Sequence, residues 1–215
     1  MASPPAGDTS PGKARMLAEA RRLFWAQGFH GTSLRDLARA YGCQPANVYN
    51  FFPNKEAILH QVLREEMEEI VLPLAEPEDD PPDDPAEQLR RLIHHHLAVT
   101  LGHRRSAKML FDVALDHLTP AHRAEVVALR DRYDHLVRGI LRRGAARGVF
   151  APLDPKLAGF MIANLITRCR VWYTPEGPMS VEELADFIWR FALAGLGHAP
   201  GGAPAPAGPE ASGAW

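Results

Sequence analysis

The sequence has little of what marks a secreted or membrane protein. Its 215 residues include two cysteines, Cys43 and Cys169, which lie far apart and form no disulfide framework, so we expect both to be reduced. No apolar run approaches the roughly 20 residues of a membrane span. No basic segment followed by an apolar one opens the chain. The sequence therefore predicts a cytoplasmic protein with no membrane partner.

Patterns typical of catalytic and metal sites are also missing. No serine or cysteine nucleophile motif appears, and the acids crowd one proline-rich stretch, so we expect no catalytic residue and no enzyme. His94, His95 and His96 are consecutive, and on a helix they would point about 100° apart, too far to chelate one ion from one face. A site made of His96 and His103 remains an alternative. Otherwise the sequence predicts no metal and no resident cofactor.

The net charge of −2 hides two regions of opposite sign. Residues 13–60 hold seven basic and three acidic side chains, a net charge of +4, whereas residues 65–87 hold eleven acids and no base. A phosphate backbone would attract only the first region. Five prolines between 73 and 85 exclude a helix across that stretch, so we expect a stiff acidic connector with a helix ending before it, near Leu72-Pro73.

Residues 31–59 carry the most informative pattern of the chain. Thr32 or Ser33 is placed to cap a first short helix, and Gly42 stands where the chain must reverse with a positive φ angle. Pro45 suits the first position of a second short helix, where no amide donor is needed. A capped helix, a glycine turn and a second short helix are typical of a helix-turn-helix motif.

Residues around this motif narrow the match. They are Phe24, Gly28-Phe29, Gly31-Thr32-Ser33, Leu37-Ala38, Gly42, Val48-Tyr49, Phe52 and Lys55-Glu56. In these residues, across 13–64, the chain resembles the TetR (tetracycline-repressor) family of bacterial transcription regulators. Asn50 departs from the pattern, because the family usually carries histidine there. The resemblance implies a DNA-binding transcription regulator.

The outward side chains of the second short helix are the predicted DNA contacts. We assign base reading to Gln44, Ala46 and Asn47, and the resemblance implies that Thr32, Tyr49 and Lys55 hold phosphates. The full predicted set is Thr32, Ser33, Gln44, Pro45, Ala46, Asn47, Tyr49, Asn50 and Lys55. One short helix discriminates too few base pairs to find a single genomic site. Two copies reading a palindromic operator would solve this.

Helical periodicity continues beyond the motif. The sequence predicts an all-α fold of about nine helices, with a three-helix DNA-binding domain over 12–53 and a regulatory domain over 54–197. One of these helices is expected near 106–117, and the tails 1–11 and 198–215 should be disordered. The segments 155–173 and 180–196 are apolar nearly all round. Such helices need cover on both sides, which predicts a homodimer formed through them.

The regulatory domain is expected to bind a small molecule. Asn164 and Arg168 interrupt an apolar stripe that also holds Trp172. Because a buried arginine without a partner is costly, Arg168 is either paired in the core or placed for an anionic ligand. His96 has the same two interpretations, as a hydrogen-bonded core histidine or as a ligand contact.

Two further stretches, 117–150 and 172–178, are similar to TetR-type regulators of fatty-acid and related acyl-CoA catabolism. The similarity rests on Leu118-Thr119-Pro120-Ala121-His122-Arg123, Leu129-Arg130-Asp131-Arg132-Tyr133 and Trp172-Tyr173-Thr174-Pro175-Glu176-Gly177-Pro178. It implies a repressor that an acyl-CoA thioester releases from its operator. The predicted ligand-binding residues are His96, Arg104, Arg105, Lys108, Phe111, Arg130, Tyr133, Asn164, Arg168 and Trp172.

The basic residues between 103 and 108 have two interpretations, as contacts for the CoA phosphates or as a solvated helix junction. A multidrug-type repressor with a promiscuous apolar pocket is the alternative function, and it does not need this basic junction.

Overall fold

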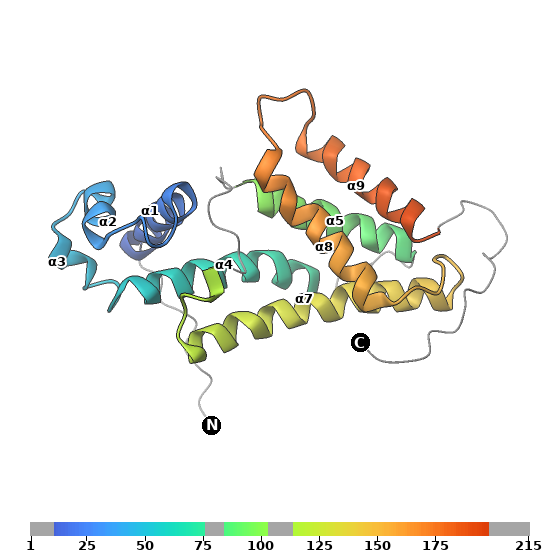
Figure 1. Ribbon diagram of the computed structural model, residues 1–215, viewed down its shortest axis with the longest axis horizontal. Helices are drawn as coiled ribbons and strands as arrows, with labels where there is room; N and C mark the ends of the chain where they lie inside the picture. Colours follow the sequence, from blue (N-terminus) through green and yellow to red (C-terminus); the bar gives the residue numbers. More distant parts are fainter. Residues whose placement is uncertain (1–10, 76–83, 103–113, 198–215) are drawn as a thin grey trace. The chain divides into compact units, whose positions relative to one another are not determined.

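The computed structural model describes residues 11–75, 84–102 and 114–197, and these residues form helices joined by turns, with no strand (Figure 1). In chain order the helices are α1 (Pro11–Gln27), α2 (Leu34–Tyr41), α3 (Pro45–Val48), α4 (Lys55–Ala75), α5 (Pro85–Gly102), α7 (Pro120–Ala146), α8 (Pro155–Trp172) and α9 (Val181–Gly195). The predicted all-α fold is confirmed. Most of the helix predicted at 106–117, most of the connector, and both tails except Pro11 lie outside the described residues.

The described residues divide into two compact units. The first holds residues 11–68 and 114–129, and the second holds residues 69–75, 84–102 and 130–197. Both α4 and α7 therefore contribute to each unit. No described helix combines the length and the apolar character that crossing a bilayer requires.

In the first unit, α1 packs on α2 and α2 packs on α3. The side chains that α1 contributes to this core include Phe24 and Trp25, each at most 1% exposed. Arg21 on α1 also reaches Glu65 on α4, with Nη2 3.2 Å from Oε2. The rest of the buried apolar set comprises Met16, Leu17, Ala20, Leu37, Ala38, Val48, Phe52, Ile58, Leu59, Val62, Leu63, Met67, Ala114, Leu115, Leu118 and Val126.

The ends of the first helices follow the local chemistry of the sequence. Helix α1 stops at Gly28, whose φ of 82° lies in the left-handed region that glycine adopts without strain. Helix α4 begins after Asn54, whose Oδ1 accepts a hydrogen bond from the Ala57 amide at 2.8 Å. This side chain satisfies one of the free amides at the helix start, as predicted.

Helix α4 runs to Ala75 and includes Pro73, so the prediction that it ends near Leu72-Pro73 is wrong. The amide that a proline lacks would have bonded to the carbonyl four residues earlier, on Glu69. In the structure His95 Nε2 on α5 lies 2.9 Å from that carbonyl oxygen. A donor from another helix thus replaces the missing one, and the helix continues for its last turn.

In the second unit, α5 packs against both α8 and α9. Asp186 on α9 joins two side chains of α5, because its Oδ1 lies 3.0 Å from Arg90 Nη2 and 2.8 Å from His94 Nε2. These hydrogen bonds hold the pKa of Asp186 below its ordinary value. The Trp189 indole adds a hydrogen bond to the Ala86 carbonyl oxygen at 3.1 Å.

Helix α7 begins and ends as predicted, with the Thr119 hydroxyl 3.4 Å from the His122 amide and Gly148 closing it at a φ of 70°. Helix α8 approaches it closely at Gly159, where a methyl group would lie 3.3 Å from Val137 Cγ1. Burial raises the pKa of the Cys169 thiol on α8 to about 11, so this thiol stays protonated and unreactive.

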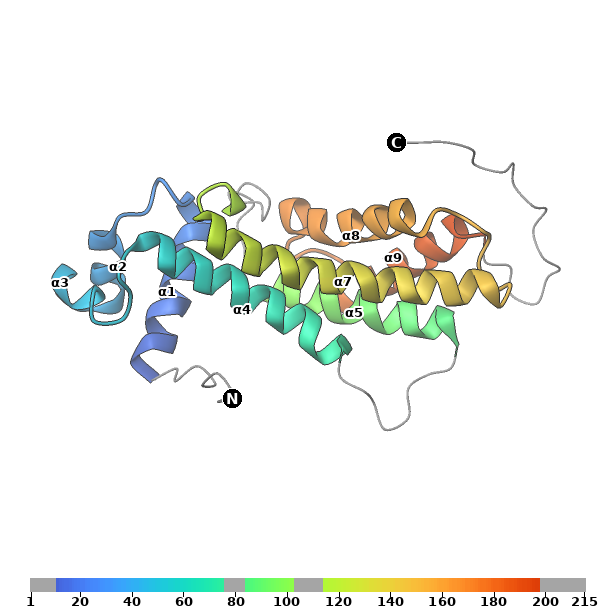
Figure 2. The same cartoon turned by 90° about the horizontal axis from the view of Figure 1, so that it is seen from below.

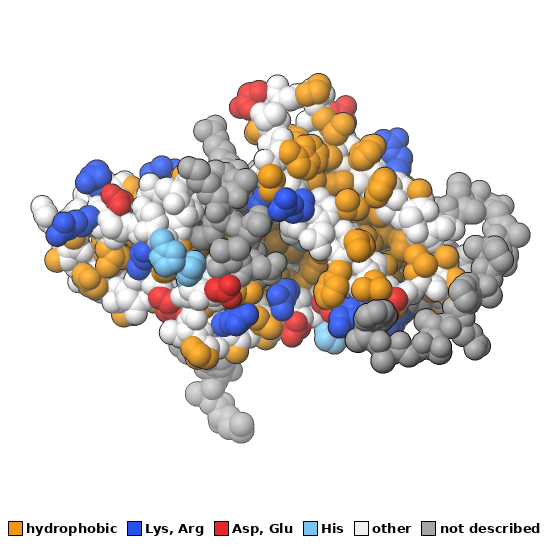
Figure 3. Space-filling model, in the orientation of Figure 1, with side chains coloured by type: hydrophobic (Ala, Val, Ile, Leu, Met, Phe, Trp, Pro, Cys, Tyr) orange, Lys and Arg blue, Asp and Glu red, His pale blue; other side chains and the backbone are white. Residues whose placement is uncertain are grey.

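A large apolar face of α8, α9 and the loop between them remains exposed. Figure 3 shows hydrophobic side chains gathered over these two helices. Met161 is 67% exposed and Trp172 is 60% exposed. The α8–α9 apolar face consists of Leu157, Phe160, Met161, Leu165, Val171, Trp172, Met179, Phe187 and Phe191.

Candidate functional site

The turn between α2 and α3 is fixed by backbone hydrogen bonds. Gly42 has a φ of 85°, and both its amide and the Cys43 amide donate to the Ala38 carbonyl oxygen at 2.9 Å. The chain then enters α3 through Gln44, whose side chain makes no capping hydrogen bond, with Pro45 at the first helical position. Val48 is fully buried and anchors the short helix. The predicted helix-turn-helix is present.

The predicted reading residues lie together on the exposed side of α3. Gln44, Pro45, Ala46, Asn47, Tyr49 and Asn50 are all exposed. Tyr49 is 58% exposed although it is aromatic. This surface is small, largely polar and open to a partner that offers hydrogen-bond donors and acceptors.

The three other predicted DNA contacts are engaged in holding the turn before α2. The Thr32 side chain is fully buried, and its hydroxyl donates to the Gly28 carbonyl oxygen at 2.9 Å. Ser33 caps α2 in a capping box with Asp36, in which each side chain accepts the other residue's amide. These residues position α2. Their contacts with DNA stay a prediction.

Lys55 also has partners within the chain. Its Nζ donates to the carbonyl oxygens of Phe29 and Thr32 at 2.8 and 2.9 Å and lies 4.1 Å from the centre of the Phe29 ring. Partial burial lowers the pKa of this lysine below its ordinary value. No pattern in the sequence indicated these contacts, because the partners lie more than 20 residues earlier in a turn.

Polar side chains interrupt the apolar core of the second unit. His96 on α5 is buried, and its Nδ1 lies 2.7 Å from the hydroxyl of Tyr133 on α7. Burial raises the pKa of Tyr133, so its hydroxyl stays protonated. Thr100 lies one helical turn beyond His96 and is fully buried, and its hydroxyl forms no hydrogen bond with the described residues. Sequence reasoning missed Thr100, although its spacing from His96 places both on one face.

Two family models match most of the chain. Residues 16–62 match the model described as bacterial regulatory proteins, tetR family, and residues 82–196 match a tetracyclin repressor-like C-terminal domain. The chain belongs to the TetR family. It is a DNA-binding transcriptional repressor with a separate ligand-binding domain, and it is not an enzyme.

Two relatives of this TetR regulator match it over nearly their whole length. The repressor KstR2 of Rhodococcus jostii (strain RHA1) is 27% identical over 201 residues, which cover 91% of this chain and 98% of KstR2. The structure of PfmR from Thermus thermophilus is 34% identical, with a TM-score of 0.73, and the match covers 85% of this chain and 98% of PfmR.

A structure of AibR in complex with isovaleryl coenzyme A and operator DNA has the same fold. The identity is 24% and the TM-score is 0.70, and the match covers 84% of this chain and 97% of AibR.

The remaining predicted ligand residues of the regulator do not gather at one place in the described structure. Arg130 is exposed on α7, while Asn164, Arg168 and Trp172 are exposed on α8. The interpretation of Arg168 as an arginine paired in the core is therefore wrong, and its contact with a ligand stays a prediction. Helix α8 buries the opposite stripe, which includes Arg170 at 7% exposure. Arg104, Arg105, Lys108 and Phe111 lie outside the described residues.

The three consecutive histidines of the regulator have three separate partners. His94 contacts Asp186, His95 contacts the Glu69 carbonyl oxygen and His96 contacts Tyr133. The predicted divergence of these side chains on a helix is confirmed. His103, the other residue of the alternative metal site, lies outside the described residues.

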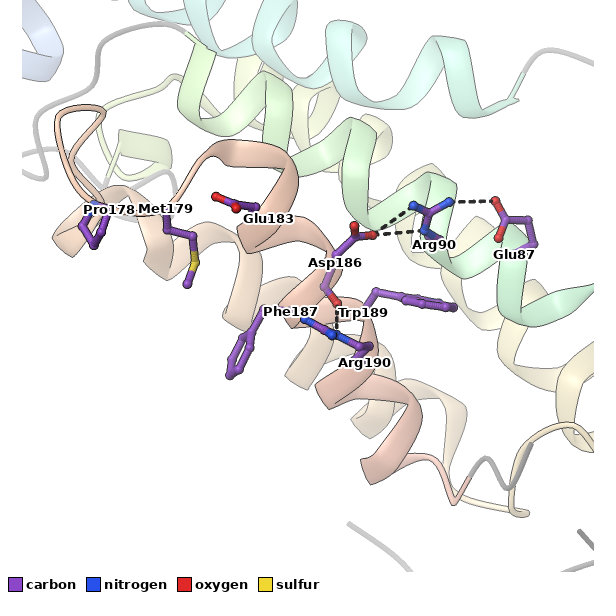
Figure 4. Close-up of a pocket in the computed structure, with 9 residues that line it drawn as sticks. All are labelled: Glu87, Arg90, Pro178, Met179, Glu183, Asp186, Phe187, Trp189 and Arg190. Carbon is purple, nitrogen blue, oxygen red and sulfur yellow. Dashed lines mark hydrogen bonds and ion pairs between the residues drawn. The ribbon is translucent and has the colours of Figure 1, made fainter. Parts of the chain in front are cut away.

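A pocket of about 540 Å³ opens at the surface between α5 and α9 (Figure 4). Its charged side chains already have partners, because Arg90 contacts both Glu87 and Asp186. None of the described residues predicted to bind ligand lines this pocket. The buried His96–Tyr133 pair is therefore the better candidate for a ligand contact.

Proposed function

We propose that this TetR regulator is a homodimer that binds a palindromic operator through α3 and is released from it by an acyl-CoA thioester. The dimer forms through the α8–α9 apolar face. The effector binds in the second unit and reaches the buried polar residues of α5 and α7. The regulated genes belong to fatty-acid or related acyl-CoA metabolism.

The exposed apolar face supports the dimer. Contiguous apolar patches of this kind are uncommon on monomers, and they mark interaction surfaces. A two-fold axis would place the same helices of both copies against one another. Two DNA-binding domains related by this axis then require two inverted half-sites. The centres of the half-sites lie about one turn of the DNA helix apart, or a multiple of it.

The Thr100 hydroxyl carries the ligand part of the proposal. A buried hydroxyl without a hydrogen bond costs roughly 1–3 kcal/mol. It lies one turn from His96 on a helix face that otherwise buries apolar side chains, including Leu89, Ile93 and Leu97. A mostly apolar ligand with one polar group would satisfy this hydroxyl and leave the remaining lining in apolar contact.

The class of ligand rests on the second resemblance in the sequence and on the relatives. AibR, which shares the fold, binds isovaleryl coenzyme A together with operator DNA. An acyl-CoA thioester has an apolar chain and a carbonyl oxygen that accepts a hydrogen bond. The basic residues 104, 105 and 108 stay predicted contacts for its phosphates.

Release would follow from a difference in affinity between two shapes of the regulatory domain. An effector that binds better to the shape unsuited to the operator shifts the population toward it. A coupling of about 1–3 kcal/mol lowers operator affinity some 5- to 150-fold.

Operator binding with and without effector tests the proposal. A long-chain acyl-CoA should weaken binding to an operator duplex selected with the purified dimer, whereas free fatty acid or CoA alone should not. Thr100→Val should raise the acyl-CoA concentration needed for release about fivefold, because one hydrogen bond is worth about 1 kcal/mol. The free variant should unfold no earlier than the parent, since the change removes no hydrogen bond to a described residue.

Thr167→Val is the matched control. The Thr167 hydroxyl on α8 already donates to the Ala163 carbonyl oxygen at 2.9 Å, so this change should leave the response to acyl-CoA unaltered. Operator binding that ignores every acyl-CoA but yields to unrelated apolar compounds would contradict the thioester and favour the multidrug-type alternative.

A further inference from the structure

Two stacked histidines join α4 to α7 in the first unit. The rings of His60 and His122 are nearly parallel, with an interplanar angle of 4° and centroids 3.9 Å apart. His60 Nε2 lies 3.0 Å from Glu125 Oε2 on α7, and His122 Nδ1 lies 2.8 Å from Glu56 Oε1 on α4. Each imidazole therefore meets a carboxylate of the other helix. The contacts advance together along both helices, which run parallel here (Figure 2).

A second histidine pair attaches the residues before α7 to the turn after α1. The His117 ring stacks on Phe29 with centroids 4.9 Å apart and meets the His30 ring edge-on at 4.4 Å. Lys55 lies over the same Phe29 ring and donates to its carbonyl oxygen. We call His30, His60, His117 and His122 the histidine junction.

The junction holds residues that position the reading motif. The turn after α1 leads directly into Thr32 and the Ser33 cap of α2, and Lys55, the first residue of α4, donates a hydrogen bond to that turn. The Glu56 carboxylate also accepts the Thr119 amide at 2.9 Å. Contacts of the junction thus connect residues 117–125 to both ends of the helix-turn-helix.

The groups around each pair disfavour extra protons. Burial lowers the pKa of His60, and the charges of His122 and Arg64 lower it further against the opposing effect of Glu125. Burial also lowers the pKa of His117, together with the charges of His30 and Lys55, while Asp116 opposes them. Burial would raise the pKa of Glu56, but the Thr119 amide and His122 outweigh it and hold that pKa below its ordinary value.

We propose that the histidine junction makes operator binding sensitive to protons. In mildly acidic solution, protonation of His60 or His117 places a positive charge close to the basic side chains of Arg64 or Lys55 and loosens the attachment of residues 117–125 to the helix-turn-helix. Local loosening of a binding element lowers affinity, because part of the free energy of DNA binding is then spent on returning that element to its ordered conformation. The inference rests on DNA binding by the family and not on the acyl-CoA proposal.

The direction of the effect follows from linkage. A histidine in the unfolded chain has a pKa of about 6.5. His60 and His117 take up protons at lower pH when folded, so below pH 6.5 the unfolded or detached state binds more protons than the folded one. The stabilisation by the junction is therefore fully present at pH 7.5 and falls as the pH drops below about 6.5.

Operator affinity measured by fluorescence anisotropy between pH 5.5 and 8, at constant ionic strength and without effector, tests the inference. The full-length parent should lose about fivefold in operator affinity between pH 7.5 and 5.5, which corresponds to about 1 kcal/mol, the scale of one hydrogen bond. The double variant His60→Gln and His122→Gln keeps polar side chains that do not titrate. It should bind within about threefold of the parent at pH 7.5 and show a flatter pH profile.

His135→Gln is the matched control. His135 is exposed on α7 in the second unit, where its Nδ1 lies 2.6 Å from the Asp131 carbonyl oxygen. Its variant should follow the pH profile of the parent. If the double variant fails to fold by circular dichroism, His122→Gln alone takes its place. A flat parent profile, or the same slope in parent and junction variants, would overturn the inference.

Discussion

The exposed side of α3 and the α8–α9 apolar face are both open to solvent, yet they differ in chemistry. The first presents small and polar residues such as Gln44, Ala46 and Asn47, whereas the second presents large apolar ones such as Met161 and Phe191. Water can satisfy the polar groups of α3, and the bases and phosphates of an operator could replace that water. It cannot satisfy an apolar face, which favours a permanent protein partner. Exposure is therefore common to both proposed functional surfaces, and the type of side chain distinguishes them.

The largest expected effect comes from charging the apolar face. Met161→Glu combined with Phe187→Glu should convert the dimer to monomers, because two like charges per copy would meet in an apolar interface. Operator affinity should fall at least about 100-fold, since the two DNA-binding domains would no longer be linked and would bind their half-sites independently. Sedimentation velocity and anisotropy would measure the two changes.

Leu72→Glu is the control for that double variant, since Leu72 is 40% exposed on α4 and lies outside the apolar face. It should remain dimeric. A charged double variant that also stayed dimeric would show that another surface joins the two copies.

An intermediate effect is expected on the polar side. Asn47→Ala should cost roughly 1–3 kcal/mol of operator binding per half-site, because a side-chain pair with a base edge would be lost. The melting temperature should not change, since Asn47 is exposed. Competition with operators altered one base pair at a time would measure the loss of discrimination. Equal discrimination before and after the change would remove Asn47 from the reading set.

The smallest expected effect concerns the backbone conformation of the helix-turn-helix and not the side chains on its surface. Gly42→Ala should destabilise the protein by roughly 1–2 kcal/mol, because alanine is strained at a positive φ. Gly195→Ala on α9 is the same chemical change at a helical position with open space around it, and it should stabilise by about 0.5 kcal/mol. Thermal unfolding of both variants would show opposite shifts, and equal shifts would contradict the role of the turn.

Features set by neighbouring residues were predictable from the sequence. The Ser33 cap, the Gly42 turn and the Pro45 helix start each depend on side chains within a few positions, and all three have the predicted place in the structure. The fold class and the helix-turn-helix follow from such local rules added to helical periodicity.

Features set by distant contacts were not predictable. Helical periodicity showed that α8 is apolar on more than one side, but not which side its own chain covers. One of the two interpretations of Arg168 therefore placed it in the core, whereas Arg170 is the buried arginine. The hydrogen bonds of Lys55 within the chain were not predicted, because the oxygens it contacts belong to a turn whose shape the sequence does not specify. Its contact with DNA stays a prediction.

The replacement of a proline's missing hydrogen bond by His95 has a mechanical consequence. His95 Nε2 lies within hydrogen-bond distance of the Glu69 carbonyl oxygen, and a one-residue slide along a helix, about 1.5 Å, would break this contact. This hydrogen bond therefore fixes the position of the last turn of α4 along α5. A ligand that displaces α5 would therefore either move the last turn of α4 with it or break this hydrogen bond. Pro73, which removes one hydrogen bond within α4, thus creates a contact through which a displacement of α5 reaches α4.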